Sequence, residues 1–117
     1  MESILTSVKK LLGIEEEYTH FDPDLIMHIN SVFMVLNQLG VGPANGFRIE
    51  DDKDTWSDYM SDEDNIDAVK SYMQLKVKLL FDPPQSSAVM EAMKRMIDEF
   101  EFRLNVAVDP GLSKTTL

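Results

Sequence analysis

The chain has 117 residues, 44% of them hydrophobic, with no cysteine and a formal net charge of −10. These totals favour one folded domain with a single core, exclude disulfide and thiolate chemistry, and are typical of a reducing compartment. No apolar run approaches the ~20 residues that span a bilayer, the start of the chain lacks a secretory signal, and the excess of acids disfavours binding to phosphate backbones.

The first predicted helix follows Ser3, which can cap it, and runs for about ten residues to Gly13, which can end it. Its apolar face would contain Ile4, Val8, Leu11 and Leu12. A helix of this length is marginal alone, so we expect it to pack on the rest of the chain.

The second predicted helix begins at Asp22, which is a good N-cap residue, and Pro23 suits its first turn. Gly40 is placed to end it. The buried face would contain Leu25, Ile29, Val32, Phe33, Leu36 and Leu39. Because Met27, Met34 and Val35 lie off that face, the helix is apolar over more than half of its girth. Such a helix is either central or covered by another protein.

Residues 40–54 are predicted to form one long irregular loop, rich in glycine and proline. The alternation at residues 47–49 allows a short strand, although not a sheet. Thr55 and Asp58 have the spacing that opens a helical turn, which would include Trp56 and Tyr59.

Residues 62–109 are predicted to form two long helices separated at Phe81-Asp82-Pro83-Pro84, where consecutive prolines forbid helical geometry. The first apolar stripe contains Ile66, Val69, Met73, Val77 and Leu80, and the second contains Val89, Met93, Met96, Phe100, Leu104 and Ala107. The two helices can pack as an antiparallel hairpin. We therefore predict an all-α fold, a small bundle of four to five helices dominated by this C-terminal hairpin, with a single domain at 1–109 and a flexible tail at 110–117.

The sequence offers no catalytic signature. Asp24 and His28 lie one helical turn apart, as metal ligands often do, but no further histidine or cysteine can complete a zinc site. The acids at 52, 54 and 58 with Glu63 resemble a calcium loop, yet Trp56 and Ser57 occupy positions that need a ligand and a glycine. We predict no enzymatic activity, no cofactor and no metal.

The acidic residues concentrate in one stretch. Residues 50–67 contain nine acids and one lysine, a net charge of −8. One interpretation is a solvated, solubilising loop. The other is a surface that does not adhere to nucleic acid or that docks a basic partner.

The methionines also allow two interpretations. Met73, Met90, Met93 and Met96 could fill the core, or they could form a contact surface that repacks against a partner. Phe102 lies off the main stripe of the last helix, which indicates more apolar surface than one partner helix can cover. The candidate subunit contacts are Met27, Met34, Met90 and Phe102.

The order and spacing of these elements resemble the small head–tail connector (adaptor, or head-completion) proteins of long-tailed bacteriophages. The resemblance covers about residues 10–105. It rests on Phe21-Asp22-Pro23, Asn30–Phe33, Leu39–Pro43, Gly46-Phe47, Thr55-Trp56, Val69–Tyr72, Leu75–Val77, Phe81–Pro84 and Glu101–Leu104. These motifs mark helix ends and turns, and none is a catalytic signature.

The resemblance implies a structural subunit that assembles into a ring of about a dozen copies beneath the phage portal protein. Such a ring extends the channel through which double-stranded DNA passes without specific binding, and it offers a platform for a tail-side connector or head-closure protein. It also implies a location at the head–tail junction of the virion, assembly in the host bacterial cytoplasm, and a phage or prophage origin.

The resemblance further implies roles for two segments. The tail would dock on the portal through Pro110, Leu112, Lys114 and Leu117. The acidic stretch would face the channel or the tail through Glu50, Asp51, Asp52, Asp54 and Asp58.

A second hypothesis needs no ring. The chain could be an acidic helical interaction module, either an inhibitor that mimics DNA charge or a small regulatory adaptor, acting as a monomer or dimer. Mimics need acids spaced along a rigid exposed face, whereas these acids concentrate in a loop and a helix start.

Overall fold

The structure of the protein is a computed structural model, which describes residues 2–61 and 63–108. The helices are α1 (Ile4–Leu11), α2 (Asp22–Gln38), α3 (Trp56–Tyr59), α4 (Glu63–Phe81) and α5 (Ser87–Val108). In the described ranges there is no strand, only an isolated antiparallel bridge between Ser3 and Thr55. None of the helices in these ranges is long and apolar enough to cross a membrane. The all-α prediction is confirmed, including the break between the two long helices.

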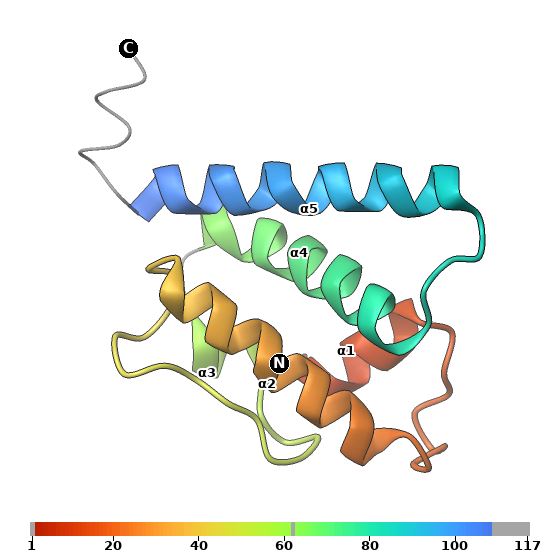
Figure 1. The fold of residues 1–117 in the computed structure, drawn as a ribbon. Coiled ribbons are helices and arrows are strands. Elements are labelled where there is room, and N and C mark those ends of the chain that lie inside the picture. Colours follow the sequence, from red (N-terminus) through yellow and green to blue (C-terminus); the bar gives the residue numbers. More distant parts are fainter. Residues whose placement is uncertain (1, 62, 109–117) are drawn as a thin grey trace.

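Helix α4 is the middle layer of the molecule. It packs on α2 on one side and on α5 on the other, and α1 contacts both α2 and α4 (Figure 1). Among the described side chains of α4, four are buried: Val69, Tyr72, Met73 and Val77.

The helix ends follow local signals in the sequence. The Ser3 hydroxyl accepts a hydrogen bond from the Thr6 amide, and Thr55 and Asp58 form a reciprocal capping box at α3. Gly13 and Gly40 adopt the left-handed conformation, with φ of 78° and 83°, directly after α1 and α2. These predictions are confirmed.

Asp22 differs from its predicted role. It is the first residue of α2 rather than its N-cap, and no side-chain cap bond is present at this end. The Asp22 carboxylate instead contacts Lys9, with 2.9 Å between Nζ and Oδ1. The angles of this contact are poor for a hydrogen bond, so the two groups interact as an ion pair.

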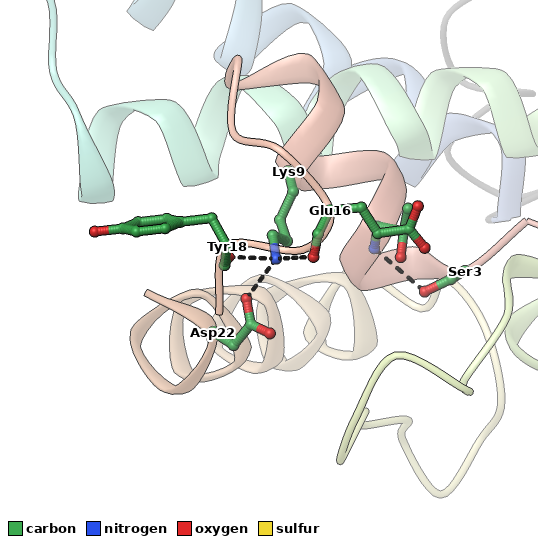
Figure 2. A network of polar contacts seen from close by, with 6 residues as sticks. Ser3, Lys9, Glu16, Tyr18 and Asp22 are labelled. Carbon is green, nitrogen blue, oxygen red and sulfur yellow. Dashed lines mark hydrogen bonds and ion pairs between the residues drawn. The ribbon is translucent and has the colours of Figure 1, made fainter. Parts of the chain in front are cut away.

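Lys9 is the centre of a small polar network (Figure 2). Its side chain is only 2% exposed, and its ammonium also donates to the carbonyl oxygens of Glu16 and Tyr18, at 2.9 and 2.7 Å. A buried ammonium needs this number of partners because desolvation of an unpaired charge is very costly. The network fixes the connection between α1 and α2 and the start of α2.

The irregular loop at 40–54 is held by asparagine side chains of α2. Asn30 donates to the Ile49 carbonyl at 3.0 Å and accepts from the Ile49 amide at 2.7 Å. Asn37 donates to the Pro43 carbonyl at 3.3 Å, and the Val41 side chain is buried. The predicted short strand at 47–49 is wrong, because the backbone of this segment pairs with a side chain rather than with another strand.

The prediction of the apolar stripes is wrong in part. Five members are exposed: Leu11, Leu80, Val89, Met96 and Ala107. The covered face of α5 is centred on Ile97 and Leu104, because α5 packs mainly on a single helix and one contact covers only a narrow strip of its surface.

Two buried tyrosines have raised pKa values. The Tyr72 hydroxyl donates to Glu101 Oε2 at 2.7 Å, and burial, this hydrogen bond and the glutamate charge all raise the pKa of Tyr72. Burial raises the pKa of Tyr59 to about 12. Both shifts favour the neutral phenol in the folded state.

Replacing Lys9 by methionine should destabilise the fold by about 2–4 kcal/mol, because the two carbonyl groups and Asp22 lose a buried cationic partner. Lys10→Met is the matched control: this neighbouring lysine is exposed, and its loss should change the free energy of unfolding by less than about 0.5 kcal/mol. Urea denaturation followed by circular dichroism measures both. Equal effects of the two substitutions would contradict the structural role of Lys9.

The tyrosine pKa shifts predict alkaline sensitivity. Tyrosines in the unfolded chain release their protons near pH 10, whereas Tyr59 and Tyr72 keep theirs in the fold. The stability that these two groups contribute should therefore be constant below pH 10 and fall as the pH rises above it. Tyr72→Phe should make this decline shallower by up to about 1.4 kcal/mol per pH unit. Urea denaturation at a series of pH values measures the slope, and an unchanged slope in the Tyr72→Phe variant would contradict this prediction.

Candidate functional site

The outward face of α2 carries two exposed methionines. Met27 and Met34 are 58% and 60% exposed, although they lie on the same helix as the fully buried Ile29 and Leu36. Ser31 and Gln38 are exposed on the same face, so this second side of α2 is apolar only in part. No element of the described ranges covers these two methionines.

A groove runs along this face, between α2 and residues 45–48 of the loop; we call it the α2 groove. Its volume is about 870 Å³. The lining includes Met27, Asn30, Met34 and Asn37 from α2 and Phe47 and Arg48 from the loop. The loop can form the second wall because Asn30 and Asn37 hold its backbone against the helix. The groove is thus a built feature of the fold, lined by both apolar and polar side chains.

Arg48 adds a positive charge at the rim of the groove. It is exposed, and it forms no ion pair or hydrogen bond within the described residues. The protein as a whole is strongly acidic, so a free arginine beside exposed methionines is a local exception. Arginine next to apolar side chains is a common composition of protein contact surfaces.

Exposed apolar side chains also lie on α5. Val89, Met96 and Phe102 are 48%, 48% and 58% exposed. Val89 and Met96 lie on one side of the helix and Phe102 lies more than about 100° around it; we call the three together the outer surface of α5. Met90, which was also predicted to contact a neighbouring subunit, is half-buried. Helices α2 and α5, which carry these exposed side chains, lie on opposite sides of α4 (Figure 1).

The acidic candidates are not equivalent. Asp54 accepts from the backbone amides of Glu50 and Asp51, at 2.7 and 3.4 Å, and Asp51 accepts from the Lys53 amide at 2.8 Å. Asp58 caps the start of α3. Three of the five acids therefore shape their own turns, which is a sufficient structural reason for their presence. Glu50 and Asp52 are exposed, and their carboxylates have no partner among the described residues.

The histidines lie in an aromatic cluster. His20 packs edge-on against Phe21, and His28 and Phe21 both contact Phe81, with ring centroids 5.0–6.5 Å apart. No group of three or more potential ligands that could hold a metal is present in the described ranges. The Glu63 side chain of the suggested calcium loop lies outside the described residues.

The tail candidates Pro110, Leu112, Lys114 and Leu117 also lie outside the described residues. The sequence interpretation missed the loop side of the groove, Phe47 and Arg48. The signal that could have found it is the pair of asparagines on α2, since a mid-helix asparagine often bonds a neighbouring backbone segment.

The chain was compared with known proteins and protein families. No curated protein and no solved structure matches it significantly. The sequence profile of one family, described as phage connector protein, matches residues 4–111. The match runs from the first residue of α1 past the end of α5, so it includes both the α2 groove and the outer surface of α5. The chain therefore belongs to the phage connector protein family.

Proposed function

We propose that the protein assembles as a ring at the head–tail junction of a phage virion, beneath the portal protein. Membership of the connector family indicates a structural role in joining head to tail. The ring, of about a dozen copies, would extend the DNA channel and present a platform for a tail-side connector or head-closure protein. It would form in the host bacterial cytoplasm, from a phage or prophage gene.

The observation that carries the proposal is the presence of exposed apolar side chains on two helices, α2 and α5, that lie on opposite sides of α4. A ring needs a heterologous contact, in which one surface of each copy binds a different surface of the next. The α2 groove with Met27 and Met34, and the outer surface of α5 with Phe102, meet this requirement. Met90 would contribute at the edge of the second surface.

The net charge of −10 per subunit supports a channel through which DNA slides without adhering. Of the acidic candidates, Glu50 and Asp52 are the residues free to face the channel or the tail. The alternative function, an acidic module that mimics DNA, is less well supported because Asp51, Asp54 and Asp58 are engaged in local backbone bonds.

Blocking either surface should prevent ring formation. Met34→Asp in the α2 groove and Phe102→Asp on α5 each leave the other surface intact and lie at exposed positions, so both variants should fold. Neither should form rings with the cognate portal protein in negatively stained micrographs. An equimolar mixture should form heterodimers by sedimentation, because each variant keeps one half of the contact, but no rings. Rings formed by either variant alone would contradict a head-to-tail contact through these surfaces; Lys10→Asp is the control.

The tail is proposed to dock on the portal. Deleting residues 110–117 should abolish binding to the portal protein while the circular dichroism spectrum and the cooperative thermal transition stay unchanged. Binding is measured by co-sedimentation with purified portal. A truncated chain that still binds the portal would contradict this assignment, and a truncated chain that loses its thermal transition would place the tail in the core.

A further inference from the structure

The α2 groove has no occupant among the described residues, although it exposes two methionines and a free arginine. An apolar groove of this kind is unfavourable to leave hydrated in a free subunit. We propose that residues 109–117 of the same chain occupy the α2 groove before assembly.

The position at which α5 ends supports this assignment. The Asn105 side-chain amide donates to the Leu39 carbonyl at 3.1 Å, and Leu104 is buried beside it. The last turns of α5 therefore lie close to the C-terminal end of α2 (Figure 1). The near end of the groove, at Asn37, is only two residues from Leu39.

The length of the segment is sufficient. The groove lies along α2 from Asn37 to Pro23, a distance of about 21 Å at the helical rise of about 1.5 Å per residue. Nine residues can span up to about 30 Å when extended. The extended length of residues 109–117 therefore exceeds the length of the groove by about 9 Å.

The chemistry of the two parts also matches. The segment has two large apolar residues, Leu112 and Leu117, and the groove offers Met34 and Met27 in the same order along its path. Leu112 can extend about 13 Å from Val108, and Met34 lies about 8 Å along α2 from Leu39, which Asn105 of α5 contacts. Methionine surfaces adapt to short apolar segments of irregular shape.

A backbone acceptor site is available as well. The Asn37 amide nitrogen donates to the loop, whereas its Oδ1 has no partner among the described residues. It can accept a backbone amide of an extended segment that enters the groove.

The inference extends the proposed function, because a tail that rests in the groove covers the surface proposed to bind the next subunit. Docking of the tail on the portal would uncover Met27 and Met34 and allow the neighbouring copy to bind. Two experiments on the isolated protein, without portal, test the occupied groove. Their failure would thus leave the proposed ring and portal docking untouched.

The native chain has no cysteine, so a disulfide can report the position of the tail. In the full chain, the pair Met34→Cys and Leu112→Cys should form an intramolecular disulfide under mild oxidation, because cysteines bridge only when their Cα atoms approach within about 7 Å. The control pair is Phe102→Cys with Leu112→Cys. Phe102 is nearly as exposed as Met34. It lies about 9 Å along α5 from Val108, which is within the ~13 Å that Leu112 can extend from Val108.

The groove pair should cross-link several-fold faster than the control pair, at a rate independent of protein concentration, as measured by intact mass under non-reducing conditions. Equal rates for the two pairs would overturn the proposal, since they indicate a tail that samples its surroundings at random. Cross-linked dimers whose yield rises with concentration would also overturn it, because they place the tail in the groove of a second copy.

A second measurement uses the native residues. Met27 and Met34 should react with hydrogen peroxide several-fold faster in a chain that ends at residue 109 than in the full chain, as followed by peptide mass mapping. Met96 on α5, which is also half-exposed, is the internal reference and should react at the same rate in both chains. Unchanged rates for Met27 and Met34 would contradict occupancy of the groove.

Discussion

The position of α4 between two layers determines most of the other features of this molecule. Its buried side chains, with Tyr72 fully enclosed, require cover from both α2 and α5. The described residues supply these two covering layers and place no further helix outside them. The outer sides of α2 and α5 are therefore left exposed, and their apolar residues remain available to other molecules.

Polar side chains hold the parts of the chain that regular structure does not. Lys9 holds the α1–α2 connection in place by donating hydrogen bonds to two of its carbonyl groups and by its ion pair with Asp22. Asn30 holds the loop by hydrogen bonds to both the amide and the carbonyl of Ile49. The Trp56 indole donates to the Ser7 hydroxyl at 2.9 Å and attaches α3 to α1. Each bond satisfies a buried group that would otherwise destabilise the fold. The second wall of the α2 groove exists because of such bonds.

The acidic residues of the stretch at 50–67 do not all have the same role. Asp51, Asp54 and Asp58 accept backbone hydrogen bonds in their own turns. Glu50 and Asp52 have no such role. Family membership identifies the class of structure to which the subunit contributes.

The sequence by itself determined the helices and their ends. Caps such as Ser3 and Thr55, the glycines after α1 and α2, and the prolines at 83 and 84 act within a few residues, so their effect can be inferred without knowing the rest of the fold. The order of these signals was also sufficient to identify the family. Only the tertiary structure decided which flank of each helix is covered, that Asp22 pairs with Lys9, and that the loop forms a groove with α2. These features depend on contacts between residues far apart in the chain, where several apolar positions on one helix compete to face a neighbour whose position no local pattern fixes.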